Sequence, residues 1–327
     1  MGTTSSASVR QWLRRYEVRP KKRWGQTFLT DPRVPARLLE LWDLKAGLRV
    51  LEIGAGAGAL TLPLLARGLK VVAVERDRLL CRLLRDRVRE ECPGTNLCIL
   101  EQDILTLDPG ETLMRASHVE SSRGPADTQP QQMAGEKCVP IGTDFPDRWV
   151  LVGNLPYAIT GSLLKWVVRN RGWFSWASLM LQREVALRLM AAPGSKAYGS
   201  LTLWVGFHFR VEKELAVDAA SFWPMPKVTS LVLRLTPRAK PPVDVPSGAM
   251  LETVVRAAFS HRRKVLAGSL ARGLGVHRRR VEDALSAAGI GPRLRAEECS
   301  LEDFAALTRS LAAGWAEEGE TAWHRKE

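Results

Sequence analysis

The sequence contains no C-x-x-C pair and no grouping of cysteine with histidine at the spacings that bind zinc. Its 327 residues include only five cysteines and five histidines. An odd, scattered set of cysteines argues against a disulfide framework and indicates reduced thiols. These cysteines are Cys81, Cys92, Cys98, Cys138 and Cys299. We therefore expect neither a structural disulfide nor a bound metal ion.

Long apolar segments are also lacking. No apolar run approaches the roughly 20 residues that a membrane-spanning helix needs, and the N-terminal segment has no apolar core of the kind found in signal peptides. Because this segment is basic and amphipathic, an organelle transit peptide is kept as a minor alternative. We expect a cytoplasmic protein with no membrane partner.

Acidic residues are fewer than basic ones. The chain has 35 Asp and Glu against 48 Lys and Arg, which gives a net charge of +13 and a pI near 10.0. Lysine and arginine that neutralise phosphates release counterions, and this gives affinity for nucleic acids without sequence readout. The charge favours a nucleic-acid partner, with a solubility charge in an arginine-rich proteome as the alternative.

The order of predicted elements is typical of a doubly wound α/β sheet. Four apolar runs alternate with amphipathic helical patterns: "LRVLEIG", "KVVAVERD", "LCILEQDIL" and "WVLVGNLPY". Two further strands are predicted at "WASLMLQ" and at the closing "KVTSLVLRLTP". We expect a Rossmann-like domain over residues 31–237, preceded by a basic segment over residues 1–30.

Two other regions depart from this alternation. Residues 109–148 are polar and rich in Gly, Pro, Ser and Gln, which predicts a surface insertion. After the linker "RAKPPVDVPSG", helical patterns over residues 249–313 carry the basic stretches "HRRK" and "HRRR". The second domain is therefore expected to be small and all-α.

The stretch "EIGAGAGAL", Glu52 to Leu60, places glycines between a predicted strand and a predicted helix. Glycine lets the backbone approach a ligand closely, and a helix N-terminus presents free N–H groups. Glu75 ends the next strand about 20 residues later, where a carboxylate accepts hydrogen bonds from ribose hydroxyls. Asp103, one strand further, would contact an adenine amine. The pattern favours an adenosine cofactor without separating NAD from S-adenosylmethionine; a tight turn with solvated carboxylates is the alternative.

Asn154, Leu155, Pro156 and Tyr157 end the fourth predicted strand, at the edge where open α/β sheets bind ligands. An adenine amine is a poor nucleophile because its lone pair is delocalised into the ring. Acceptors on Asn154 and on the Leu155 carbonyl would direct that lone pair toward an electrophile, with Pro156 fixing the turn. Tyr157 would stack on a flipped-out base. Taken alone, the stretch also fits a simple strand-ending turn.

The motifs together resemble the ribosomal RNA adenine N6,N6-dimethyltransferase family. The resemblance covers most of the chain, through "KKRWGQTFL", "EIGAGAGALT", "VERD", "QDIL", "GNLPY", "MLQREVALRLMAAPGSKAYGSLT", "FWPMPKVTS" and "AFSHRRKVLAGSL". It implies a class I S-adenosylmethionine-dependent methyltransferase domain followed by a helical domain that contacts RNA. Within the family, the Leu-Pro-Tyr form and the "AYGSL" and "RRK" segments are similar to the small-subunit enzyme.

The resemblance also implies roles for single residues. Base handling would fall to Asn154, Leu155, Pro156 and Tyr157, with Phe222 as a second stacking wall or, alternatively, a core aromatic beside Trp223. Cofactor contacts would come from Gln26, Thr27, Leu29, Gly54, Gly56, Glu75, Asp103 and Asn154. RNA contacts would come from Lys21, Lys22, Arg23, Arg262, Arg263 and Lys264. Charge runs are otherwise usually solvated helix faces.

Three positions depart from the family pattern. Thr27 stands where the family usually has Asn, Ala158 replaces a common Asn after the tyrosine, and the insertion at 109–148 is long. The change at Thr27 would alter a side-chain contact to the cofactor, and the change at Ala158 would remove a side-chain contact at that position.

The resemblance implies that the chain uses S-adenosylmethionine to dimethylate two adjacent adenosines near the 3′ end of small-subunit rRNA. The substrate would be a pre-ribosomal particle and the enzyme a monomer. Four alternatives stay open: a large-subunit rRNA methylase that confers macrolide resistance, a non-catalytic rRNA- or DNA-binding factor on this fold, an NAD-dependent dehydrogenase and a DNA adenine methylase. The dehydrogenase would leave the Asn-Leu-Pro-Tyr turn unexplained.

Overall fold

The computed structural model describes residues 8–110, 112–113, 148–261, 264–291 and 293–317. Contacts divide the chain into two units. The first comprises Met1–Arg183 and Glu212–Pro237, and the second comprises Glu184–Val211 and Arg238–Glu327. Most of the predicted insertion, residues 114–147, lies outside the described residues.

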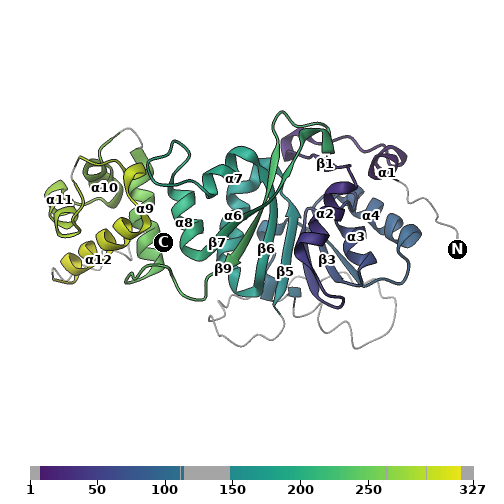
Figure 1. Cartoon of the computed structure of the whole chain (residues 1–327), viewed down its shortest axis with the longest axis horizontal. Helices are drawn as coiled ribbons and strands as arrows, with labels where there is room; N and C mark the ends of the chain where they lie inside the picture. Colours follow the sequence, from purple (N-terminus) through teal and green to yellow (C-terminus); the bar gives the residue numbers. More distant parts are fainter. Residues whose placement is uncertain (1–7, 111, 114–147, 262–263, 292, 318–327) are drawn as a thin grey trace. The chain divides into compact units, whose positions relative to one another are not determined.

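Seven strands of the described chain form one sheet in the order β4-β3-β2-β5-β6-β9-β7 (Figure 1). They are β2 (Arg49–Ile53), β3 (Lys70–Glu75), β4 (Leu97–Glu101), β5 (Trp149–Asn154), β6 (Phe174–Gln182), β7 (Phe209–Val217) and β9 (Ser230–Pro237). Strands β2 to β6 pair in parallel, whereas β9 is antiparallel to β6. A separate antiparallel pair joins β1 (Phe28–Leu29) to β8 (Phe222–Trp223). The mainly parallel sheet confirms the predicted α/β class.

The first unit has helices where the amphipathic patterns predict them and one more, at residues 9–15, that was not predicted. They are α1 (Val9–Arg15), α2 (Arg33–Trp42), α3 (Thr61–Ala66), α4 (Arg78–Glu91) and α6 (Thr160–Arg169). Short 3-10 turns are η1 (Lys22–Trp24), η2 (Ile104–Thr106), η4 (Tyr157–Ile159), η5 (Arg171–Trp173) and η6 (Ala219–Ser221). Helix α4 shows why such a pattern folds: Asp77 caps its first turn by accepting from Leu79 N at 3.1 Å. Its apolar side chains recur every three or four residues and are buried. Leu84 and Val88 join the core that contains the strands, whereas Leu83 packs in a cluster with Trp12 of α1.

The strand at the edge of the sheet is not the predicted closing strand. Strand β9 lies inside the sheet, and β7 lies at the edge. The segment "FRVEKELAV" of β7 escaped prediction because four of its nine residues are charged and most of the nine are exposed or half-buried. An edge strand needs little apolar surface, and charged side chains there discourage pairing with other chains.

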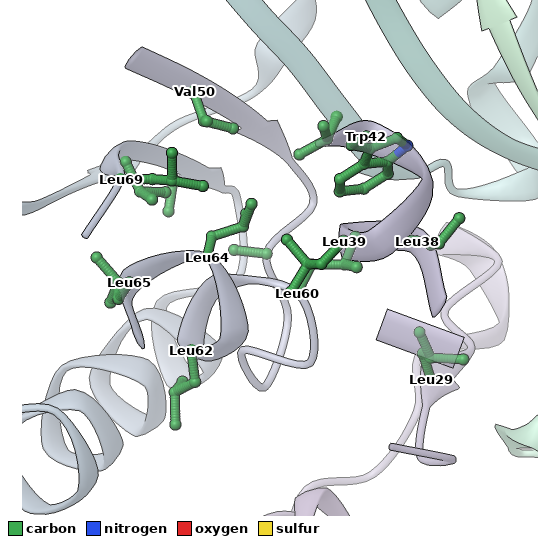
Figure 2. Close-up of a cluster of buried hydrophobic side chains, with 14 of the residues drawn as sticks. Leu29, Leu38, Leu39, Trp42, Val50, Leu60, Leu62, Leu64, Leu65 and Leu69 are labelled. Atoms are coloured by element: carbon green, nitrogen blue, oxygen red, sulfur yellow. The ribbon is translucent and has the colours of Figure 1, made fainter. Parts of the chain in front are cut away.

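The core of the first unit lies between the sheet and its helices. Strands β2 and β3 are buried along almost their whole length, as expected for parallel strands covered on both faces. Figure 2 shows Leu39 of α2 beside Leu60, which directly precedes α3. This packing fixes α3 and the turn before it relative to β2, and that turn is the glycine stretch of the motif.

The second unit is helical. Its helices are α7 (Arg183–Leu189, whose first residue belongs to the first unit), α8 (Ser200–His208), α9 (Gly248–Ala258), α10 (Leu266–Leu274), α11 (Arg278–Ala287) and α12 (Leu301–Glu317), with η7 (Phe259–His261) and η8 (Ala296–Glu298). They enclose a core that includes Val254, Leu270 and Phe304. No helix among the described residues is long and apolar enough to cross a membrane.

The observed division differs from the predicted one at residues 184–211, which the sequence placed in the first domain. This segment belongs with the helical unit because it bonds to the chain's C-terminal part. Gly194 N donates to the Glu297 carbonyl at 2.7 Å, and the Tyr198 hydroxyl donates to the Cys299 carbonyl at 2.9 Å.

A carboxyl group is buried inside the sheet at Glu52 of β2, which is 2% exposed. Its Oε2 accepts a hydrogen bond of 2.6 Å from the Thr61 hydroxyl of α3. Burial raises the pKa of Glu52 to about 7; the Thr61 bond opposes this rise and the nearby Glu75 charge adds to it. The side chain therefore changes its protonation state near neutral pH.

Replacing Gly58 with alanine should destabilise the first unit by about 1–3 kcal/mol. Gly58 has φ +81°, and an added Cβ would lie 2.6 Å from Leu84 Cδ1 and 2.7 Å from Leu62 Cδ1. Gly161→Ala is the matched control, because nothing lies within 4 Å of a Cβ there. Denaturant unfolding of both variants measures the difference, and equal stabilities would contradict the packing described.

The free energy of unfolding should fall as the pH rises from 5 through about 7, in part through Glu52. In this window the folded protein keeps a proton that the unfolded chain has lost, so the stabilisation is full below the ordinary pKa of 4.5 and is lost above about 7. The total for Glu52 is on the order of 3 kcal/mol. Unfolding measured against pH should give a flatter profile for Glu52→Gln, whereas Glu40→Gln, at an exposed carboxylate, should keep the wild-type slope. Identical slopes in wild type and Glu52→Gln would contradict the assignment.

Candidate functional site

A cavity of about 840 Å³, counting its opening to solvent, lies at the carboxyl ends of the parallel strands. Its walls come from the chain before and within β1, from the glycine turn after β2, from the ends of β3, β4 and β5, and from η4. The residues are 23–28, Ile53, Gly54, Gly56, 74–76, Leu80, 102–104, 154–156 and Ile159. Parallel strands end at one edge of a sheet, so motifs far apart in the sequence meet here.

The glycine turn forms the floor of this cavity with left-handed backbone at Gly54 (φ +68°) and Gly56 (φ +55°). A Cβ at Gly54 would lie 3.5 Å from the Asn154 carbonyl oxygen, and one at Gly56 would lie 3.5 Å from Phe28 Cδ1. The missing side chains leave the backbone open to a ligand. Both predicted glycine positions therefore line the cavity.

Glu75, at the end of β3, is 7% exposed and lines the same cavity. Its two oxygens accept from Gly56 N at 3.0 Å and from Asp77 N at 2.9 Å. Burial raises the pKa of Glu75, and these backbone donors oppose the rise. A carboxylate oxygen has two lone pairs, so Glu75 can still accept hydrogen bonds from ligand hydroxyls.

Asp103, just beyond β4, also lines the cavity. Its Oδ1 accepts from Leu105 N at 3.0 Å and caps the turn η2, while its Oδ2 lies 3.2 Å from Arg76 Nη1. The predicted strand end near Asp103 is two residues late, because β4 ends at Glu101. The cap and the ion pair hold the carboxylate at the cavity wall.

Asn154 is the last residue of β5, and its side chain crosses to the N-terminal segment. Nδ2 donates to the Thr27 carbonyl at 3.1 Å, whereas Oδ1 is buried with no partner among the described residues. An unsatisfied buried acceptor costs about 1–3 kcal/mol. The amide is thus oriented by one contact, and its oxygen is left able to accept a hydrogen bond.

The three residues after Asn154 divide between the cavity and its surroundings. Leu155 and Pro156 line it, and Leu155 N donates to the Met180 carbonyl of β6 at 3.1 Å. Tyr157 is half-buried and outside the lining, with its hydroxyl 3.1 Å from Ser230 Oγ of β9. The side chain of Ala158 lies outside the described residues.

The predicted residues of the N-terminal segment do not all reach this cavity. Gln26 and Thr27 line it, and Gln26 accepts from Lys21 N at 2.9 Å and donates to Asp77 at 3.3 Å. Leu29 is 3% exposed and instead lines a neighbouring cavity of about 340 Å³, together with Glu52 and the shared residues Thr27 and Asn154.

Phe222 lies in the core and does not line the cavity, so the structure differs here from the second stacking wall expected from the resemblance. Its ring is 1% exposed, because β8 pairs with β1 and brings Phe222 opposite Leu29. The neighbouring Trp223 is 36% exposed and stacks on Phe28, with ring centroids 6.2 Å apart. The alternative considered for Phe222, a core aromatic, fits this position.

Several cavity residues were given no role from the sequence, among them Trp24, Arg76 and, in the smaller cavity, Glu52. Lys21 Nζ lies 4.2 Å and the Arg76 guanidinium 4.5 Å from the centre of the Trp24 ring. Such cation–π contacts fix the indole at the cavity wall. The signal available in the sequence was an aromatic residue inside the basic stretch "KKRWGQ".

The predicted RNA-contacting residues differ in their exposure to solvent and in their ion pairs. Lys21 pairs with Asp77 at 2.7 Å, and this contact with that of Gln26 lowers the pKa of Asp77 although burial raises it. Lys22, Arg23 and Lys264 are exposed. Arg262 and Arg263 lie outside the described residues.

Comparisons with known proteins identify a family for this chain. The model of the family described as ribosomal RNA adenine dimethylase matches residues 18–313. Ribosomal RNA small subunit methyltransferase A of Geobacter sulfurreducens is 40% identical over 297 residues, covering 90% of this chain and 96% of the relative. The protein of the same name from Myxococcus xanthus is 36% identical over 306 residues, covering 93% and 95%.

Two solved structures share the fold. The crystal structure of the 23S rRNA methyltransferase ErmE has a TM-score of 0.58 and 27% identity, covering 87% of this chain and 99% of that one. A dimethyladenosine transferase from Plasmodium falciparum has a TM-score of 0.61 and 22% identity, covering 89% and 98%. With the family model over nearly the whole chain and relatives at this identity, the chain belongs to the ribosomal RNA adenine dimethylase family.

Proposed function

We propose that this chain uses S-adenosylmethionine to dimethylate the N6 amines of two adjacent adenosines near the 3′ end of small-subunit rRNA, in a pre-ribosomal particle. The relatives that are 34–40% identical are named ribosomal RNA small subunit methyltransferase A. The observation that carries the chemistry is the buried, unpartnered Oδ1 of Asn154 at the cavity edge.

The cavity fits the proposed cofactor through the kind of groups that line it. Two carboxylates, Glu75 and Asp103, suit ribose hydroxyls and an adenine amine, and the open backbone at Gly54 and Gly56 suits close approach. Gln26, Thr27 and Asn154, which line the same cavity, would complete the binding set. When bound, the cofactor supplies an activated methyl group on a sulfonium centre.

The Asn-Leu-Pro-Tyr turn would position the adenine amine. Asn154 Oδ1 would accept from one N–H and the Leu155 carbonyl from the other, which removes the amine lone pair from conjugation with the ring. Tyr157 would stack on the base, with its ring held by the hydroxyl contact to Ser230. The methylated amine then loses a proton to solvent. Catalysis would rest on positioning and electrostatics, without a strong general base.

The alternatives have less support. The large-subunit methylase ErmE is 27% identical to this chain, less than the relatives named for the small subunit. A binding factor without catalysis has no need of an amide oxygen left without a donor. We further propose a cytoplasmic monomer. Its net charge of +13 suits binding to rRNA.

Labelled S-adenosylmethionine tests the proposal. The protein is incubated with under-methylated small subunits, large subunits, naked rRNA or DNA, and the labelled nucleosides are identified after digestion. Dimethyladenosine from small subunits is the expected product. Label in large-subunit RNA or in DNA would favour the corresponding rival, and cofactor binding without transfer would favour the binding factor.

Asn154→Ala should lower kcat on small subunits by about 10²–10³-fold, because a preorganised acceptor is removed. Asn96→Ala is the matched control, since Asn96 is exposed at the far end of β4. Single-turnover rates at saturating cofactor measure the change. A rate within a few-fold of wild type for Asn154→Ala would contradict the role of this amide.

A further inference from the structure

Arg87 of α4 is a buried charged residue that the function described above does not use. It is 5% exposed, although arginine is almost never buried without a partner. Its Nε lies 3.1 Å from Glu91 Oε1 one helical turn later, so the charge is paired. Its Nη1 donates at 2.6 Å to the carbonyl of Ala57, 30 residues earlier in the chain. The side chain therefore bonds directly to the glycine turn.

The Ala57 carbonyl belongs to the most conformationally free part of the site. Ala57 lies between Gly56 and Gly58, and both glycines have left-handed φ values. On the other side of Gly56, its N–H is held by Glu75 at 3.0 Å. An anionic side chain thus fixes an N–H of the turn, and a cationic side chain fixes a carbonyl one residue further on. Without either contact, the glycines would allow the turn many other conformations.

The orientation of Arg87 depends in turn on the N-terminal helix. Glu91 accepts from Arg87 and also from Trp12 Nε1 of α1, at 2.6 Å. Trp12 is 1% exposed and shares a small apolar cluster with Ala57 and Leu83. Figure 1 shows α1 beside α4, the helix that carries Arg87 and Glu91. A continuous set of contacts runs from Trp12 through Glu91 and Arg87 to the glycine turn.

We infer that Arg87 is a positioning residue that holds the glycine turn in the conformation that receives the cofactor. Helix α1 fixes the orientation of the Arg87 side chain through Trp12 and Glu91. This inference rests on the proposed use of S-adenosylmethionine. Because Ala57 directly follows Gly56, which lines the cofactor cavity, loss of the contact affects cofactor affinity and leaves RNA affinity unchanged. The N-terminal helix thereby becomes part of the cofactor site without lining the larger cavity.

Arg87→Met keeps the length of the side chain and removes its donors. We expect Kd and KM for S-adenosylmethionine to rise by about 10- to 100-fold, the equivalent of one lost charge-assisted hydrogen bond, with kcat at saturation nearly unchanged. KM for small subunits should stay at the wild-type value. Arg87→Lys retains one donor for the Ala57 carbonyl and should recover part of the affinity. Isothermal titration of the full chain with S-adenosylmethionine and steady-state kinetics provide these values.

Arg89→Met is the matched control, because Arg89 lies on the same helix with its side chain 79% exposed. It should leave Kd unchanged. If Arg87→Met lowers the melting temperature but binds the cofactor as wild type does, Arg87 supports only folding and the inference fails.

Trp12→Phe provides a second, milder variant in case Arg87→Met does not fold. It keeps an aromatic ring in the cluster and removes the N–H that Glu91 accepts, so Kd should rise about three- to tenfold. A wild-type Kd for Trp12→Phe would overturn the coupling to α1. Absence of cofactor binding by the wild-type chain would instead overturn the proposed function, and the inference with it.

Discussion

The hydrogen bond from Gly56 N to Glu75 is the contact on which the site depends. It joins the turn after β2 to the end of β3. The ends of these two strands and the start of α3 are therefore held in fixed positions relative to one another. The bond forms only because Gly56 takes a left-handed conformation and because burial keeps water from competing for the carboxylate. The same carboxylate also lines the larger cavity. One side chain therefore both holds the turn and forms part of the cavity wall.

A second constraint is the hydrogen bond between the N-terminal segment and β5. Thr27 offers its carbonyl to the Asn154 amide, and this contact leaves Oδ1 as the free end of the side chain. The departure from the family pattern at Thr27 leaves this contact intact, because the backbone makes it. A substitution of the Thr27 side chain therefore leaves in place the contact that orients Asn154.

Much of the site could be predicted because parallel strands bring their carboxyl ends together. Gly54, Glu75, Asp103 and Asn154 each follow an apolar run, and this pattern alone assigns them to one edge. Other features depend on pairings between distant segments. Phe222 is buried because β8 meets β1 nearly 200 residues earlier, and no local pattern distinguishes that from an exposed aromatic. The contact of Arg87 with Ala57 likewise joins a helix to a loop 30 residues away. The charged residues of β7 hid this strand from prediction, because an edge strand requires little apolar surface.

The path of the chain between the two units has a consequence for folding during synthesis. The chain leaves the first unit after Arg183 and returns at Glu212, so residues 184–211 are made before the helices that cover them. Leu203 and Phe207 of α8 pack in a core with Leu251 and Val254 of α9, which emerge about 45 residues later. Until then this apolar surface has no partner within its own unit. Helical order in the second unit is thus gained late in translation, when the first unit already has most of its strands.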